Sequence, residues 1–547
     1  YAEGRGESIM TAFDPAERDA KVFALYEQLL EIEQRLIPTG LHVFGRPSQA
    51  TEKTDLLKMI ASFDRPEVGV RALPEDGIDE AVREYVENGV EAVVRLFGEE
   101  TRPVFELLET VSTKLQTNHE MDSLVRALRG EFIAPGPGAD IVQNPDILPT
   151  GRNTHAINPY GVPSAPAFAR SEAVANSLLD RYKNENGRYP EAMALVLWGL
   201  DNIKTQGEGV AQALWLLGVR PVRDALNRTT SVEAIQLAEL GRPRIDVVMT
   251  VSGIFRDLFS PTVQLLDKAV RLVARLDEPL DQNYVRKHVL QQVEQDSCDT
   301  DDAAIRVFSN APGNYGTNVN FMVMDSQWES EETLGDLFVT RKCFAYGRDS
   351  KGRAIEGREA RLAMDRALSR VEATYQNIDT FEIGLTDVDH YFEYLGGVSK
   401  AVEKRAQARP AIYLSDTLSR DVKIRSLEET VRLETRAKTL NPKWYEGMLK
   451  HGFRGVAEIE NHVSNTFGWS ATADAVDDWI YSEVANTFVF DDSMLDRLRD
   501  LNPHSAHSLV QRLLEANGRG YWDIDDGVLE KLRDISRRLE DQLEGVL

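Results

Sequence analysis

Hydrophobic residues follow a helical spacing near both ends of the chain. In the first 130 residues, apolar side chains recur at helical intervals, for example from Ala20 to Glu33 and from Asp79 to Phe97. That spacing places them on one face of an α-helix. It returns from about residue 355 and ends in a charged amphipathic stretch from Leu529 to Leu543. Both ends of the chain are therefore predicted to be mainly helical.

The middle of the chain has short, continuous apolar runs instead. Two of them are Ala192-Met-Ala-Leu-Val-Leu-Trp-Gly and Arg244-Ile-Asp-Val-Val-Met-Thr-Val-Ser-Gly, and a third begins at Ala304. A helical stretch, 210–217, separates the first two. Continuous apolar strands with a helix between them are typical of parallel βαβ units with both faces covered. We predict an α/β fold with large all-helical portions, with parallel βαβ units in the middle and helical regions at both ends.

Proline and glycine cluster at 134–138 and again at 148–159, where a hinge is expected. We therefore predict three domains. Residues 1–147 form a mainly helical domain, and 148–350 form an α/β domain with a parallel sheet. Residues 351–547 form a second mainly helical domain, with an active-site loop near 381–397.

The chain is acidic, with a formal net charge of −26 over 547 residues. Such a surface repels nucleic acid and anionic membranes, so we expect no nucleic-acid partner. No apolar run approaches the roughly 20 residues of a membrane helix, so no integral membrane segment is expected. Two cysteines, Cys298 and Cys343, are too few for a disulfide framework and fit a reducing compartment such as the cytoplasm. The first residues, Tyr-Ala-Glu-Gly-Arg-Gly, include no initiator methionine, and we expect the natural protein to extend upstream.

The loop after the first predicted strand contains Lys204 and Glu208. Ligands of open α/β sheets lie beyond the carboxyl ends of the strands, which makes both residues candidates for binding or catalysis. Alternatively, Glu208 is only an acidic residue at a helix start. Gly207 and Gly209 are a weak dinucleotide signal, because Gln212 replaces the third glycine of that fingerprint. The sequence contains no Walker A motif.

The loops after the next two predicted strands have further polar candidates. Arg256 could hold a substrate carboxylate, or it could pair with its neighbour Asp257. Asn310 and Tyr315 belong to a loop rich in asparagine and glycine, which suits ligand binding or a tight structural turn.

A later segment, Leu385-Thr-Asp-Val-Asp-His-Tyr-Phe, combines acidic, basic and aromatic side chains. Asp387, Asp389 and His390 could accept protons, and carboxylate oxygens suit a hard ion such as Mg²⁺. The ring of Tyr391 could stack on a flat ligand. The alternative interpretation is a solvated acidic turn without chemistry.

Several longer motifs occur in a fixed order along nearly the whole chain. They include Leu148-Pro-Thr-Gly-Arg-Asn, Asp201-Asn-Ile-Lys-Thr-Gln-Gly-Glu, Arg242-Pro-Arg-Ile-Asp-Val-Val, Ser252-Gly-Ile-Phe-Arg-Asp and Leu440-Asn-Pro-Lys-Trp-Tyr-Glu-Gly-Met. In this order they resemble the large subunits of magnesium and cobalt chelatases. Thr154-His-Ala-Ile-Asn-Pro and Asn283-Tyr-Val-Arg-Lys-His look like the magnesium branch.

The resemblance implies a specific activity. The large subunit binds protoporphyrin IX and inserts Mg²⁺ in chlorophyll or bacteriochlorophyll biosynthesis, while separate AAA+ motor subunits hydrolyse ATP. The missing Walker A motif agrees with that division. The expected location is the cytoplasm, or the chloroplast stroma in a plant or alga.

The resemblance also assigns roles to the candidate residues. Asp387 is the expected base and Mg²⁺ ligand, and the supporting catalytic candidates are Asp389, His390 and Glu208. Some magnesium-type relatives have serine in place of Asp389, which makes Asp387 the better candidate. The expected porphyrin contacts are Lys204, Arg256, Asn310, Tyr315, His155 and Tyr391.

The sequence leaves three alternatives open. Family members have an upstream His-Gly-x-Leu-Glu-like motif, which is missing here, so we expect this chain alone not to insert metal. It could therefore be a porphyrin-binding or docking module without chemistry of its own. It could also be a tetrapyrrole-sensing regulator, or part of the cobalt chelatase large subunit.

Overall fold

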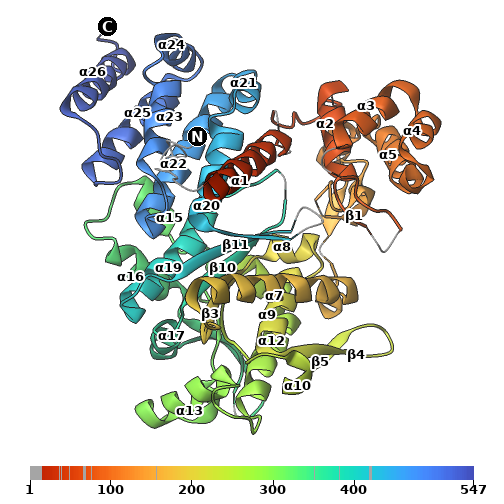
Figure 1. Cartoon of the computed structure of the whole chain (residues 1–547), viewed down its shortest axis with the longest axis vertical. Coiled ribbons are helices and arrows are strands. Elements are labelled where there is room, and N and C mark those ends of the chain that lie inside the picture. Colours follow the sequence, from red (N-terminus) through yellow and green to blue (C-terminus); the bar gives the residue numbers. More distant parts are fainter. Residues whose placement is uncertain are drawn as a thin grey trace.

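The computed structural model describes residues 15–546 except 36, 39, 49, 66–68, 75–76, 139, 156, 350, 381 and 418–421. Its centre is an eight-stranded mixed sheet with helices on both faces, and helical regions lie at both ends of the chain (Figure 1). The predicted α/β class with large helical portions is therefore confirmed. Within the described residues, no helix is both long and apolar enough to cross a membrane.

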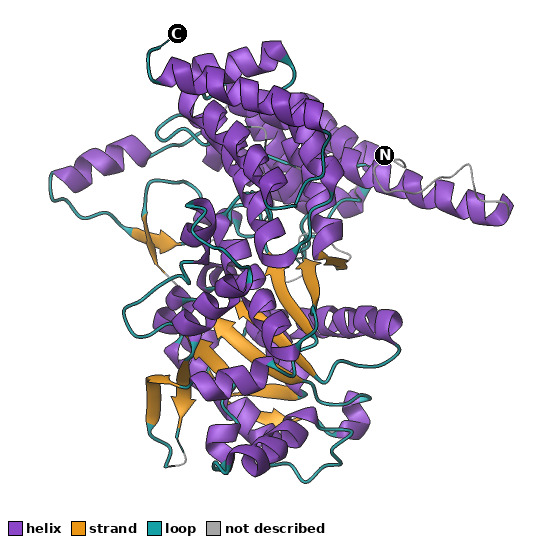
Figure 2. Cartoon of the chain, turned by 90° about the vertical axis from the view of Figure 1, so that its left-hand side faces the viewer, coloured by secondary structure: helices purple, strands orange, loops and turns teal. Residues whose placement is uncertain are grey.

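The sheet has the strand order β12-β11-β10-β3-β6-β7-β8-β9. Its five inner strands are parallel: β11 (Ala411–Asp416), β10 (Ala373–Ile378), β3 (Ala192–Leu197), β6 (Asp246–Val251) and β7 (Val307–Ser309). The antiparallel strands at the two sides are β12 (Lys423–Ser426), β8 (Phe344–Arg348) and β9 (Ala354–Glu359). The strands run through the middle of the molecule, flanked by helices (Figure 2).

The sheet crosses the domain boundary that was predicted near residue 350. Strand β10 pairs directly with β3, with Ala373 opposite Met193, and β11 and β12 continue the sheet beyond it. The region predicted as mainly helical from 351 therefore also contributes strands to the sheet, as far as β12. The hydrophobic pattern misses β10 because the strand contains buried polar side chains that are hydrogen-bonded: the Tyr375 hydroxyl lies 2.7 Å from Asn377 Oδ1 and 2.7 Å from the hydroxyl of Ser415 on β11.

The central strands are covered on both faces. Along β3, Met193, Leu195 and Leu197 face one core, with α7 (Ala165–Asn186), α9 (Glu208–Leu217), α12 (Ser260–Ala274) and α13 (Tyr284–Asp296). The alternate residues Ala192, Ala194 and Val196 face the other core, with α16 (Glu332–Lys342), α17 (Arg361–Leu368), α19 (Gly397–Ala406) and α22 (Phe453–Ala473). Because side chains alternate along a strand, a strand buried on both faces is apolar throughout.

Helical regions lie before and after the segments that form the sheet. After α1 (Pro15–Gln34), a separate core formed around Phe105 and Ile60 joins α2 (Ala50–Ala61), α3 (Ile78–Asn88), α4 (Val90–Phe97) and α5 (Arg102–Leu115). At the other end, the predicted charged helix is present as α26 (Asp526–Leu543). It follows α20 (Leu427–Glu434), α21 (Pro442–Leu449), α23 (Asp478–Phe488), α24 (Asp492–Leu501) and α25 (Pro503–Gly518).

Short elements connect these layers. They are α6 (Glu120–Leu128), β1 (Pro135–Pro137), β2 (Asn153–His155), α8 (Gly199–Lys204), β4 (Val219–Arg223), β5 (Thr229–Ala234), α10 (Leu237–Leu240), α11 (Gly253–Leu258), α14 (Thr300–Ala303), α15 (Val319–Met324) and α18 (Asp389–Tyr391). Two π-helical turns, η7 (Phe392–Gly396) and η8 (Thr435–Thr439), and three 3₁₀ turns, η4 (Glu99–Thr101), η5 (Pro145–Ile147) and η6 (Pro159–Gly161), complete the described elements.

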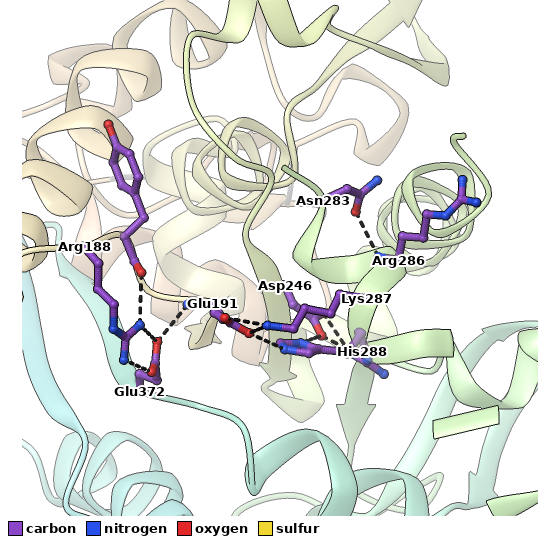
Figure 3. A network of polar contacts seen from close by, with 10 residues as sticks. Arg188, Glu191, Asp246, Asn283, Arg286, Lys287, His288 and Glu372 are labelled. Atoms are coloured by element: carbon purple, nitrogen blue, oxygen red, sulfur yellow. Dashed lines mark hydrogen bonds and ion pairs between the residues drawn. The ribbon is translucent and has the colours of Figure 1, made fainter. Parts of the chain in front are cut away.

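A buried ion pair joins β6 to β7 at the amino edge of the sheet. Asp246 accepts hydrogen bonds from the Arg306 guanidinium at 2.8 and 3.0 Å. It also lies 2.9 Å from Nδ1 of His288 (Figure 3). Burial alone would raise the pKa of Asp246, but Arg306 and His288 lower it to about 2. Its charged form therefore contributes to the stability of the sheet.

We predict that Asp246→Asn weakens this edge of the sheet by about 3–5 kcal/mol, because it leaves the buried Arg306 charge uncompensated. Amide hydrogen exchange in β6 and β7 would measure the loss. The stabilisation that Asp246 provides is fully present above its unfolded-state pKa of about 3.9. It is lost as the pH falls through the native-state pKa of about 2. The matched control is Asp349→Asn in an exposed turn, which should leave exchange in β6 unchanged.

Candidate functional site at the carboxyl edge of the sheet

Acidic residues follow two adjacent parallel strands where each strand ends. Asp201 lies in α8, directly after β3, and Asp379 is the first residue after β10. Because β10 and β3 are paired and parallel, both residues lie at the carboxyl edge of the sheet. This is the edge at which open α/β sheets bind their ligands.

Asp201, Asp379 and Lys204 form a buried charged cluster. Lys204 Nζ lies 2.8 Å from Oδ2 of Asp379, and the residues Asp201 and Asp379 are 5% and 2% exposed. Burial, followed by the negative charges of Asp379 and Glu208, raises the pKa of Asp201 well above its ordinary value. Its Oδ1 atom has no hydrogen-bond partner among the described residues. Asp201 is therefore a carboxyl group with a high proton affinity and a free acceptor atom.

Glu208 joins the same cluster from the start of α9. Burial raises the pKa of Glu208, although an ion pair with Arg170 partly opposes the shift. The preceding residue, Gly207, has a φ of +94°, and a Cβ there would lie 2.5 Å from Val162. Glycine is therefore required for the tight turn that brings Glu208 into the cluster.

Aromatic side chains lie beside these carboxyl groups. The Trp198 ring centroid is 5.8 Å from that of Tyr391 and 4.4 Å from that of Tyr394. Trp198 Nε1 donates to Gln376 on β10 at 3.2 Å. Burial, followed by the charges of Asp379 and Asp201, raises the pKa of Tyr391 well above its ordinary value. The predicted candidate Tyr391 thus belongs to the same site as Lys204 and Glu208.

Asp387 is held by two side-chain partners, Lys438 and His462. Its carboxylate lies 2.5 Å from Lys438 Nζ and 2.9 Å from His462 Nε2, and it accepts a hydrogen bond from the Gly384 amide. Burial alone would raise the pKa of Asp387, but Lys438 and His462 hold it far below its ordinary value. In this arrangement Asp387 is an ion-paired anchor, which argues against the predicted roles of base and Mg²⁺ ligand.

Asp389 and His390 connect the same segment to a neighbouring loop. Asp389 accepts a hydrogen bond from Asn320 at 2.6 Å, and His390 Nδ1 lies 2.8 Å from Glu393. The hydrogen bond to Glu393 raises the pKa of His390. The buried Glu393 also accepts a hydrogen bond from the Asn318 amide at 2.9 Å. Asp389 and His390 are therefore both hydrogen-bonded to other side chains of the protein.

Arg256 organises a loop, contrary to its predicted contact with a substrate carboxylate. It pairs with Asp257 at 2.6 Å, as the alternative interpretation held, and donates to the carbonyls of Asn310, Ala311 and Asn314. Its guanidinium nitrogens are thus engaged by protein groups, which argues against a substrate contact.

Asn310 and Tyr315 belong to the same loop cluster. Asn310 is fully buried and accepts a hydrogen bond from Lys342 Nζ at 3.0 Å, which speaks against its predicted substrate contact. The Tyr315 hydroxyl donates to Asp257 at 2.5 Å, and its ring is half exposed. The backbone of His155 pairs with Pro137 in the short parallel strands β2 and β1, but its side chain lies outside the described residues.

The sequence predicted three members of the site, Lys204, Glu208 and Tyr391, and missed Asp201, Asp379 and Trp198. Asp201 and Trp198 could have been found from their position directly after a predicted strand. Asp379 could not, because the strand before it was not predicted. No group of three or more His, Cys, Asp or Glu side chains in the described part of the chain is arranged to hold a metal ion.

Residues 5–529 match the protein family described as CobN/Magnesium Chelatase. The chain is 42% identical to the chloroplastic magnesium-chelatase subunit ChlH of Oryza sativa subsp. indica, over 97% of this chain and 43% of that protein. It is also 42% identical to the H-type magnesium-chelatase subunit of Rhodobacter capsulatus, over 95% of this chain and 40% of that protein. The chain thus spans less than half the length of these relatives.

A solved structure is similar as well. The catalytic subunit of cobaltochelatase from Mycobacterium tuberculosis superposes with a TM-score of 0.92 and is 33% identical. The match covers 97% of this chain and 47% of that chain. The fold at the carboxyl edge of the sheet is therefore shared with a protein of known structure.

We predict that Asp387→Ala loosens the 382–388 loop, because it leaves the buried Lys438 without its carboxylate. Amide hydrogen exchange in that loop should rise by about tenfold or more, which corresponds to roughly 1.4 kcal/mol. The control is Asp389→Ala two residues later, which removes a carboxylate hydrogen-bonded to Asn320. Equal exchange in the two variants would contradict the assignment of Asp387 as an anchor.

Proposed function

The chain belongs to the CobN/magnesium chelatase family, and from that premise we propose that it is the porphyrin-binding part of a magnesium chelatase large subunit. The proposed reaction inserts Mg²⁺, a substrate here, into protoporphyrin IX on the way to chlorophyll or bacteriochlorophyll. Identity of 42% with the named magnesium-chelatase subunits, against 33% with the cobaltochelatase structure, supports magnesium over cobalt.

The observation that carries the proposal is the pair of buried carboxyl groups with raised pKa values, Asp201 and Glu208. Metal insertion replaces the two N–H protons of the porphyrin, so the site needs proton acceptors. A carboxyl group with a raised pKa is a stronger base than an ordinary carboxylate, and such groups cluster at functional sites. We therefore assign proton acceptance to Asp201 and Glu208.

Asp387 has the opposite property. Its low pKa makes it a weak base, and a Mg²⁺ ion could bind it only by displacing Lys438. We propose that it positions the segment that carries Tyr391. Asp389 and His390 have the same positioning role through Asn320 and Glu393.

The aromatic side chains beside the acidic cluster fit a flat macrocycle. Trp198 and Tyr391 could stack on a porphyrin ring held over the carboxyl groups. Lys204 supplies a positive charge for a propionate, since its pKa is raised: burial would lower it, but the attraction of Asp379 and Asp201 outweighs that effect. Arg256 is not assigned a porphyrin contact, because its guanidinium already donates hydrogen bonds to backbone carbonyls.

We propose that this chain alone is not sufficient for Mg²⁺ insertion. The relatives are more than twice as long, so the rest of the large subunit and separate AAA+ motor subunits, which hydrolyse ATP, complete the enzyme. The proposed location is the cytoplasm, or the chloroplast stroma in a plant or alga. Insertion is therefore to be assayed with the whole large subunit together with its motor subunits.

We predict that Asp201→Asn and Glu208→Gln each lower the rate of Mg²⁺ insertion by about 100-fold, the usual effect of losing a general base. Fluorescence of the metallated porphyrin measures the rate, and quenching of protein fluorescence measures porphyrin affinity, which should change less than about threefold. Glu530→Gln on the exposed helix α26 is the matched control. Insertion at the normal rate in both variants would overturn the proposal.

We further predict that insertion slows as the pH falls, because a protonated Asp201 cannot accept a pyrrole proton. Removing the neighbouring charge with Asp379→Asn should lower the pKa of Asp201 and move the acidic limb of the pH–rate profile to lower pH. The profile is measured at saturating motor subunits and ATP. An acidic limb that stays in place, as it should in Glu530→Gln, would count against Asp201 as the base.

A further inference from the structure

A cavity lies at the amino edge of the sheet, opposite the edge that holds the acidic cluster. It has a volume of about 480 Å³ and is lined by residues that directly precede three strands: Glu191 before β3, Glu372 before β10 and Pro410 before β11. Because these strands are parallel, the cavity and the acidic cluster lie at opposite ends of the same strands. Its volume falls in the range of small-molecule sites. The proposed chemistry does not use this cavity.

The carboxylates in the cavity wall are already paired. Glu372 forms a two-pronged ion pair with Arg188 and accepts a hydrogen bond from the amide of Glu191 at 2.8 Å (Figure 3). The Glu191 side chain lies 2.6 Å from Lys287 Nζ and 3.1 Å from Nε2 of His288. The wall therefore has no carboxylate left to neutralise another cation.

Arg370 is the cation that lacks such a partner. It lines the cavity, and its Nη1 atom is buried without a hydrogen-bond partner among the described residues. Its neighbour Arg366 pairs with Asp296 at 2.9 Å, and Asp246 pairs with Arg306. The carboxylates near Arg370 are thus held by other guanidinium groups. A buried, unpaired N–H of this kind costs about 1–3 kcal/mol or more.

We propose that this cavity binds a small organic anion through a carboxylate or phosphate group that pairs with Arg370. A planar guanidinium matches both groups with two parallel hydrogen bonds. The exposed Ser369 borders the same space and supplies a hydroxyl, whereas the cations Lys287 and Arg409, which also line it, are paired with carboxylates. The anion would compensate the charge of the Arg370 guanidinium, which lines the cavity without a carboxylate partner among the described residues.

The burial of Arg370 agrees with this assignment. Burial, and after it the positive charge of Arg306, lowers the pKa of Arg370. The protein thus makes the charged form of this side chain less favourable, and a bound anion would stabilise it. A cationic ligand is disfavoured by the same charges.

The test is calorimetric titration of the whole 547-residue chain at low ionic strength, with inorganic phosphate in one arm and succinate in the other. Arg370→Gln should weaken binding by at least about tenfold, the effect of losing one charge-assisted pair. Arg361→Gln, an exposed arginine at the start of α17, the helix that ends two residues before Arg370, is the matched control and should bind as the unmodified chain does.

If the Arg370→Gln variant does not fold, a second variant tests the same proposal. Ser369→Asp places a carboxylate at the cavity wall beside Arg370 and should block both probes by occupying the site. Binding of one probe alone would support the proposal and identify the group that is recognised. No binding of either probe, or equal binding by the Ser369→Asp variant, would overturn it.

Discussion

Burial of β3 and β6 on both faces is the constraint on which the rest of the structure depends. Every side chain of these two strands is buried, and the two cores that cover them take alternate residues. A strand in such a position has little room for charged groups along its length, since burying an unpaired charge is costly. Charged side chains are therefore concentrated where the strands begin and end. Both proposed sites therefore lie at the edges of the sheet and not on its faces.

The direction in which the pKa of a buried carboxyl group moves depends on the charged groups beside it. Asp201 and Asp387 lie in the same region, yet their pKa values move in opposite directions. Asp201 has acidic neighbours and a free oxygen, so burial raises its pKa. Asp387 has Lys438 and His462, whose attraction exceeds the effect of burial. A catalytic role for an acidic residue near this edge is thus a question of its neighbours, which lie far away in the sequence.

The sequence was sufficient where local pattern determines structure. It predicted β3, β6 and the helical ends, and it placed Lys204 and Glu208 beyond a strand end, because apolar runs and glycine turns are local signals. It failed at β10, whose Thr374, Gln376 and Asn377 read as polar but are buried through hydrogen bonds to Ser399, Trp198 and Tyr375. It could not foresee the Lys438 pair of Asp387, since 51 residues separate the two. The Arg256–Asp257 pair was one of two predicted alternatives, but the bonds of Arg256 to the carbonyls of the 310–314 loop could not be foreseen for the same reason.

The two edges of the sheet have opposite charge imbalances. At the carboxyl edge, Asp201, Asp379 and Glu208 face two cations, Lys204 and Arg170, so one acid is left to hold a proton or to release it. At the amino edge, Arg306, Arg366 and Arg370 face Asp246 and Asp296, so one guanidinium is left over. Neither imbalance stabilises the fold, because each leaves a buried charge or donor without a partner. In both of our proposals the missing partner comes from outside the chain: porphyrin protons at one edge and an anion at the other.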